Sequence, residues 1–221
     1  MTKLVAMPTT SRELFRLTFP RVLQFSYLNT MRGMLADCRT CLDIGCGGWS
    51  PVQHLRFEYS VGVEGFPALL DEARKNKTHT EFVFARAQDI GGRFTAGQFD
   101  CCVALDLIEH LMKEDGLKLI RDMERIAAKK VLVFTPSGFL SQRSHDGDLQ
   151  EHLSGWSADE MRSLGFEVFG MHGPRFLRGE EHRHRFRPQA LSGVVSAAGH
   201  YIHTMRHPEK AAAILCVKKV G

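Results

Sequence analysis

Short apolar runs and segments of helical periodicity alternate along most of this 221-residue chain. Nearly continuous apolar strands are buried on both faces, and right-handed crossovers then place helices on both sides of a parallel sheet. The alternation therefore predicts a doubly wound α/β fold. Strands are predicted at Thr40–Ile44, Tyr59–Val63, Glu81–Ala85, Phe99–Leu105, Lys130–Phe134, Phe166–Met171 and Ala211–Lys218, and helical segments at Pro51–Leu55, Pro67–Lys75, Lys113–Ala128 and Ala158–Leu164.

Two segments stand outside this alternation. Residues 1–37 contain the capping-box pattern Thr10-Ser-Arg-Glu13 and are predicted to form an N-terminal helical segment. Residues 173–207 combine an Arg/His/Gly-rich loop with a predicted helix at Gln189–Met205. Neither a linker-like stretch nor an internal repeat separates them from the rest. We therefore expect one domain, 1–221, with a basic insertion before the last strand.

Composition narrows the class of protein. A hydrophobic content of 43% is sufficient for a buried core and argues against a disordered chain. No uncharged run reaches the roughly eighteen residues of a membrane span, and charged residues occupy the N-terminus where a signal peptide is apolar. Most of the six cysteines fall in apolar runs, which is typical of reduced core thiols in a cytoplasmic protein. The Cys38–Cys41 spacing lacks the second pair that a zinc site needs.

The net charge of +4 is concentrated at one end of the chain. Residues 172–221 contain nine Lys/Arg and three acids, a balance of +6, which leaves −2 for the preceding residues. A basic end on a mildly acidic body is compatible with an anionic partner near one face, although a solvated basic surface is the commoner cause of this pattern.

The stretch LDIGCGGWS, Leu42–Ser50, forms a glycine turn after the first predicted strand. A dinucleotide site would carry a third glycine at Ser50, and Asp43 would repel a pyrophosphate. S-adenosylmethionine instead presents a sulfonium and an ammonium group, which Asp43 attracts. Glu64, 21 residues further on at the end of the second strand, is placed to accept both ribose hydroxyls. The alternative for Asp43 is a turn-capping role.

Four motifs in register, LDIGCGG, GVEGF, AQDI and FDCCVALDLIEHL, resemble those of class I S-adenosylmethionine-dependent methyltransferases, particularly the small bacterial and archaeal type 11/12 domains. The resemblance covers roughly residues 41–171. It implies a Rossmann-like sheet of seven strands, mostly parallel with an antiparallel last strand. It also implies a set of residues that bind the cofactor: Gly45, Cys46 and Gly47 at the methionine part, Glu64, Gly65 and Phe66 at the ribose and adenine, Ala87, Gln88 and Asp89 at the adenine amino edge, and Asp106 and Leu107 over the sulfonium.

The adenine-edge acid can be placed in two registers. The family usually has an acid two residues after the strand, where one alignment puts Arg86. Shifting the register makes Asp89 the acid, and we favour that assignment.

Methyl transfer to a hydroxyl requires a base as well as an aligned acceptor, and histidine suits this task near pH 7. His110 and His152 fall at strand ends or in the loops above them, so they are the candidate catalytic residues. The alternatives are a capping role for His110 and a loop-anchoring role for His152. We expect Trp156 to wall the acceptor from water, and Arg175 and Arg178 to clamp an anionic group on it.

The favoured function is therefore methylation of a small polar, anionic acceptor, with O-methylation as the preferred reaction. An RNA or protein methyltransferase using the basic end is the first alternative, and a non-catalytic cofactor-fold module the second. His200, His203 and His207 recur at helical spacing without a carboxylate cluster, so no metal site is predicted. The sequence predicts no oligomeric state.

Overall fold

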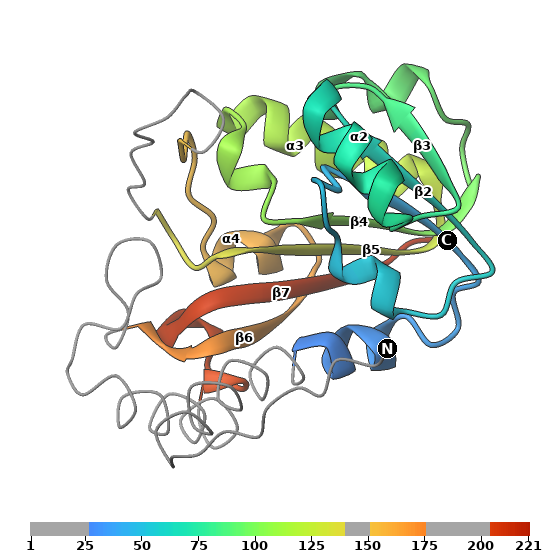
Figure 1. Ribbon diagram of the computed structural model, residues 1–221. Coiled ribbons are helices and arrows are strands. Elements are labelled where there is room, and N and C mark those ends of the chain that lie inside the picture. The colour runs from blue at the N-terminus through green and yellow to red at the C-terminus, as the bar shows by residue number, and fades with distance from the viewer. Residues whose placement is uncertain (1–26, 140–150, 176–203) are drawn as a thin grey trace, which may run out of the picture.

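The computed structural model describes residues 27–139, 151–175 and 204–221 (Figure 1). Seven strands form one sheet in the order β3-β2-β1-β4-β5-β7-β6. Neighbours from β3 to β5 pair in parallel, and β7 is antiparallel to both β5 and β6. The predicted mostly parallel sheet with an antiparallel last strand is confirmed. The strands are β1 (Thr40–Ile44), β2 (Tyr59–Glu64), β3 (Glu81–Phe84), β4 (Phe99–Leu105), β5 (Ala127–Pro136), β6 (Glu167–Pro174) and β7 (Ala211–Lys219).

Helices connect the strands as the sequence predicts. The α-helices are α2 (Pro67–Asn76), α3 (Lys113–Ile126) and α4 (Ala158–Ser163), and residues 27–34 are also helical. Short 3-10 helices are η1 (Pro51–His54), η2 (Ala87–Gly92), η3 (Ile108–His110) and η7 (Pro208–Lys210). The segment predicted at Pro51–Leu55 is thus a single 3-10 turn. Helix α3 ends two residues early because Ala127 takes an extended backbone and begins β5.

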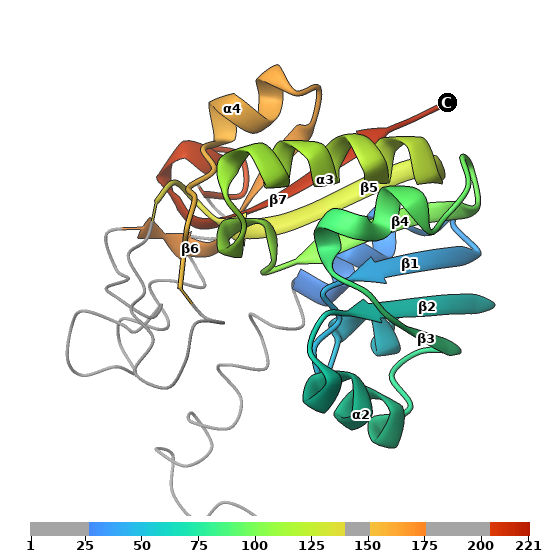
Figure 2. The ribbon, with the colours of Figure 1, turned by 90° about the horizontal axis from the view of Figure 1, so that it is seen from above.

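Alternation along the central strands gives the sheet two apolar faces. In β1, Leu42 and Ile44 face the core that α3 and α4 cover, whereas Cys41 faces the core that the 27–34 helix and η1 cover. Figure 2 shows α3 and α4 lying together on one side of the sheet. Both faces are therefore covered, which defines a doubly wound sheet. All six cysteines are buried free thiols, as expected.

Parallel pairing places the ends of β1, β2, β4 and β5 at one edge of the sheet. The chain runs outward from β1 through β2 to β3, and then returns to β4 on the other side of β1. Such a reversal of strand order is where open α/β sheets bind ligands. Within the described residues, no helix has the length and apolar character needed to cross a membrane.

Candidate active site

The glycine turn after β1 is held tightly against its neighbours. Gly45 and Gly47 have φ values of +71° and +58°, which favour glycine. The backbone N–H groups of Gly45 and Cys46 both donate to the carbonyl of Val63, at 2.8 and 3.1 Å. A Cβ at Gly45 would lie 2.8 Å from Cδ1 of Leu107, so the turn and the segment after β4 are in contact. The Cys46 side chain is buried, which leaves only its backbone for a ligand.

Glu64 joins the end of β2 to this turn. Its Oε2 accepts from the Gly47 N–H at 2.9 Å, and its Oε1 accepts from the Phe66 N–H at 3.0 Å. These two bonds fix the orientation of the buried carboxylate. Phe66, which follows Gly65, keeps 41% of its surface exposed and so presents an open aromatic ring beside the carboxylate.

Asp43 lies buried beneath the turn, where its Oδ2 accepts from Ser50 Oγ at 2.5 Å. The same oxygen lies 3.0 Å from Nε2 of His79, whose Nδ1 is 2.9 Å from Thr78 Oγ1. The sequence reasoning missed His79. The available signal was Gly62 in the middle of an apolar strand, since a Cβ there would lie 2.8 Å from the His79 ring.

The segment predicted to read the adenine edge forms η2. Ala87 and Gln88 are half-buried, and Asp89 is exposed. The Gln88 side chain donates to Asp115 on α3 at 3.3 Å, so it points toward the helix. Asp89 therefore keeps its carboxylate accessible, while Arg86, the alternative position, is also exposed.

The other half of the site begins at Asp106, directly after β4. This residue has a φ of +50°, a left-handed conformation that is uncommon outside glycine, and its N–H donates to the carbonyl of Phe134 on β5. Asp106 retains exposed surface, yet the surrounding protein excludes enough water to raise the pKa of its carboxyl.

Glu109 on η3 is the second residue that the sequence reasoning did not single out. Its side chain is 2% exposed, and its Oε2 accepts from Thr135 Oγ1 at 2.9 Å. Burial and the nearby negative charge of Asp106 raise the pKa of Glu109 despite this hydrogen bond. The buried Tyr27 hydroxyl also has a raised pKa, first because of burial and then because of Asp106 and other acids. Tyr27 in the 27–34 helix thus lies close to these carboxylates.

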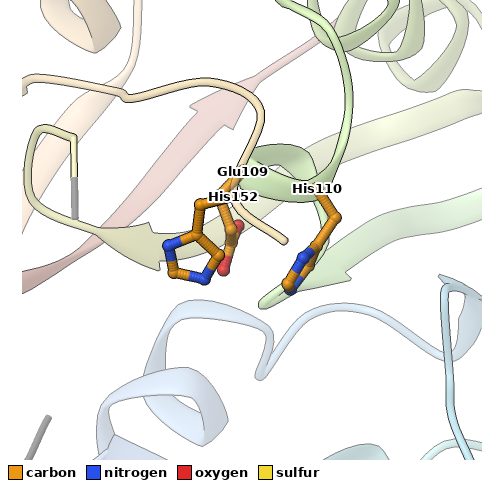
Figure 3. A group of neighbouring side chains, drawn as sticks. All are labelled: Glu109, His110 and His152. Carbon is orange, nitrogen blue, oxygen red and sulfur yellow. The ribbon is translucent and has the colours of Figure 1, made fainter. Parts of the chain in front are cut away.

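His110 and His152 meet beside Glu109. Their ring centroids are 4.9 Å apart with planes tilted by 72°, and Figure 3 shows the three side chains converging from two segments. The His110 Nδ1 lies 3.0 Å from the carbonyl of Glu151. Burial, with a smaller contribution from His152, lowers the pKa of His110. The structure therefore brings together both histidines predicted from the sequence.

Main-chain hydrogen bonds attach the His152 segment to η3. The N–H groups of Leu153 and Ser154 donate to the carbonyl of Glu109 at 2.8 and 3.0 Å, and Ser154 Oγ donates to the carbonyl of Ile108 at 3.1 Å. The position of His152 opposite His110 is thus fixed by these bonds, which directly follow it in the chain, and by the Glu151 carbonyl directly before it, which lies against His110.

Trp156, which the sequence predicts to shield the acceptor from water, is enclosed by the protein. Its side chain has 0% exposure, and its Nε1–H donates to Ser154 Oγ at 3.0 Å. Lys113 Nζ lies 3.6 Å from the centre of the indole ring. Gly116 on α3 makes room for the ring, since a Cβ there would be 2.5 Å from it. Trp156 therefore packs the loop onto α3 instead of contacting solvent or ligand.

Arg175 lies at the end of β6, on the same edge of the sheet as the two histidines. It is exposed, and its Nη2 donates to the carbonyl of Phe139 at 3.4 Å, just beyond β5. Arg178, the second predicted clamp, lies outside the described residues, as do His200 and His203. His207 is within 3.3 Å of Glu209.

Part of the chain that contains these site residues matches a known protein family. A family model described as a methyltransferase domain matches residues 42–135, which include the glycine turn, Glu64 and the segment after β4. Residues 42–135 are therefore similar to a methyltransferase domain. The match indicates an enzyme, a methyltransferase that uses S-adenosylmethionine as its cofactor.

Solved structures share the fold of this methyltransferase domain. The methyltransferase domain of bacterial CtHen1 superposes with a TM-score of 0.59 at 15% identity, covering 90% of this chain and 99% of that one. A SAM-dependent methyltransferase from Archaeoglobus fulgidus gives 0.55 at 14%, covering 95% and 100%. An O-methyltransferase family protein from Burkholderia thailandensis gives 0.55 at 14%, covering 94% and 57%. No curated protein sequence matches the chain.

Proposed function

We propose that this methyltransferase domain methylates a hydroxyl group of a small, polar, anionic acceptor. One observation carries the proposal: the glycine turn contacts the side chain of Leu107, and Leu107 directly precedes the segment that bears Glu109 and His110. A methyl donor in the turn would thus lie next to a buried cluster able to receive an acceptor's proton. S-adenosylmethionine supplies an electrophilic methyl group whose carbon–sulfur bond breaks with its electron pair on sulfur while the acceptor oxygen bonds to the carbon.

The described residues suit this cofactor. A carboxylate offers about four lone-pair positions, and the two backbone donors leave Glu64 free to accept ribose hydroxyls as well. Asp43 and Asp106 place negative charge near the turn, where a sulfonium and an ammonium group are attracted. We assign the remaining contacts as the sequence predicts: Gly45, the Cys46 backbone and Gly47 to the methionine part, Gly65 and Phe66 to the adenosine, Ala87, Gln88 and Asp89 to the adenine edge, and Leu107 to the sulfonium.

The histidine pair supplies the acid–base function in this proposal. The lowered pKa of His110 favours its neutral form, and a neutral imidazole can accept a proton. His152, buried beside it, is the group that we place nearest the reacting hydroxyl. Because His152 and Glu109 are buried and His110 is half-buried, water competes less well with the acceptor for this position.

The expected anionic character of the acceptor rests on Arg175. Its guanidinium is exposed at the same sheet edge and uses a backbone carbonyl as its one described partner, so donors remain for a carboxylate or phosphate. We extend this role to Arg178 from the sequence. The six buried thiols favour a reducing compartment, and we place the enzyme in the cytoplasm.

The test is methyl transfer from methyl-labelled S-adenosylmethionine to matched pairs of acceptors. Each pair contains a small hydroxy acid and its deoxy analogue, and a short RNA is assayed in parallel. We expect S-adenosylhomocysteine to form only with hydroxyl-bearing acids. Transfer to the deoxy analogues would contradict O-methylation, and salt-sensitive transfer to the RNA would favour the nucleic-acid alternative.

A further inference from the structure

The cluster of Glu109, His110 and His152 has the geometry of a cation site as well as that of a base. One carboxylate oxygen and one ring nitrogen from each histidine all lie within 4.8 Å of one another (Figure 3). Ligands about 2.0–2.2 Å from a common ion are separated by distances in this range. Two imidazoles and a carboxylate also form a ligand set that first-row divalent ions prefer.

The hydrogen bond of His110 determines which ring nitrogen can bind an ion. The Glu151 carbonyl oxygen can only accept, so Nδ1 must carry the proton in the 3.0 Å bond between them. In a neutral ring, Nε2 then holds an available lone pair. A metal-binding histidine characteristically donates its other N–H to a backbone carbonyl in this way.

Glu109 and His152 are also held in place by groups behind them. Thr135 Oγ1 donates to one carboxylate oxygen of Glu109, which leaves the other oxygen for a ligand. The carbonyl of Glu109 accepts from two N–H groups of the segment that follows His152, so the two segments cannot separate without losing these bonds. Such supporting contacts orient the ligands of metal sites.

The buried negative charge of the Glu109 carboxylate is an independent argument for a bound cation. A buried carboxylate is costly unless a cation or several donors compensate it. Among the ion pairs formed within residues 27–139, 151–175 and 204–221, none involves Glu109. The negative charge of Asp106 lies near Glu109 as well. A divalent ion would neutralise this concentration of acids.

We propose that Glu109, His110 and His152 bind one first-row divalent metal ion that holds the acceptor hydroxyl of the methyl-transfer reaction. The second half of this statement rests on the proposed function. Three protein ligands leave coordination positions open for oxygen atoms of the acceptor. The ion lowers the pKa of a bound hydroxyl, whose proton passes to water, and the resulting alkoxide attacks the methyl group. His152 then acts as a ligand and not as a free base, and the site departs from the sequence prediction of no metal.

The experiment titrates the chelator-treated full chain with Co²⁺, using calorimetry and visible absorption. We expect one ion per chain and d–d bands typical of nitrogen ligation. His152→Ala and Glu109→Gln should weaken binding more than about 100-fold, and Thr135→Val, which keeps all three ligands, about 10–100-fold. His54→Ala, which removes an exposed histidine outside the cluster, should bind like the wild type. Circular dichroism confirms the fold of each variant.

Two outcomes would overturn the cation site: absence of stoichiometric Co²⁺ binding, or equal binding by wild type, His152→Ala and Thr135→Val. S-adenosylmethionine affinity and methyl transfer are measured on the same chelated and reloaded samples. Hydroxyl methylation that persists unchanged after chelation would leave the proposed function intact and refute the role of the ion. Tight Co²⁺ binding without methylation of any hydroxy acid would support the site and refute the proposed function.

Discussion

The buried acids in the two halves of the site, at the same edge of the sheet, differ in how many hydrogen-bond partners the protein gives them. Below the ends of β1 and β2, Asp43 and Glu64 each have two hydrogen-bond partners from within the protein. Beyond β4, Glu109 has one described side-chain donor, Thr135, and Asp106 adds to its charge. The protein itself supplies hydrogen-bond partners for the acids beside the glycine turn, which we call the cofactor half of the site. The acids beyond β4, in what we call the acceptor half, retain negative charge that an external cation would neutralise.

The largest expected effect is a loss of turnover without a loss of cofactor affinity, and it comes from removing the His152 side chain. His152→Ala should lower turnover by about 10²–10⁴-fold, because it removes a proton acceptor or a ligand of the reacting centre. S-adenosylmethionine affinity should stay unchanged, since no described contact joins His152 to the glycine turn. Turnover is measured under saturating cofactor, with affinity determined by calorimetry. Near-wild-type turnover would leave His152 as a loop anchor, and a loss explained by a lower Tm would do the same.

The next effect falls on the cofactor half. Glu64→Ala and Asp43→Ala should each weaken S-adenosylmethionine binding by about 1.5–3 kcal/mol, because each removes a charged hydrogen-bonding group. The two differ in a second respect: Asp43→Ala also leaves the buried His79 without its carboxylate, so we expect it to lower Tm more. Titration calorimetry at constant salt and thermal unfolding measure both. Unchanged cofactor affinity in two folded variants would contradict the assigned cofactor site.

The contrast between the halves also explains what sequence could predict. The glycine turn and Glu64 were identified because strand ends, glycines and an acid at a fixed spacing are local signals. His79 was missed because its partner, Asp43, is brought near it only by the pairing of β1 with β2 and of β2 with β3. Thr135 reaches Glu109 through the β4–β5 pairing in the same way.

Trp156 shows a different limit. An aromatic residue in a glycine-containing loop suggested an apolar wall beside the acceptor, but the surface that such a ring packs against depends on the fold, and here it is the space at Gly116 on α3. The periodicity of the α3 sequence identifies its apolar face. A glycine on that face, here Gly116, does not indicate that an aromatic ring from a distant segment will pack there.

A third prediction concerns pH and applies to the metal-free protein. Burial raises the pKa of Glu109 above its unfolded value, so the folded state binds more protons between those two pKa values. The free energy of unfolding should therefore fall as pH rises through that window, from about 4.5 upward, with a slope of at most about 1.4 kcal/mol per pH unit for one group.

Glu109→Gln should flatten this slope, because an amide does not titrate. Urea unfolding at pH 5, 6, 7 and 8 with chelator present measures the effect, and Glu124→Gln, at a partly exposed ion pair with Lys218, is the control. Equal slopes for wild type and Glu109→Gln would show that Glu109 does not titrate in this window.

The smallest expected effect tests the outer rim of the acceptor half. Arg175→Gln together with Arg178→Gln should raise the acceptor KM while leaving S-adenosylmethionine affinity nearly unchanged, because Arg175 lies beside Phe139 and outside the glycine turn. An exposed ion pair is worth about 0.2–1 kcal/mol, so the described arginine predicts a change of roughly 1.4- to 5-fold. Arg162→Gln, which removes an exposed arginine paired with Asp159 on α4, is the matched control and should leave KM as in the wild type.

The discriminating comparison uses an acceptor acid and its uncharged amide. If Arg175 contacts the anionic group, the double substitution raises KM for the acid and leaves KM for the amide unaltered. An equal rise for both acceptors would show that the arginines act on the loop, and no rise for either would make them part of the solvated surface.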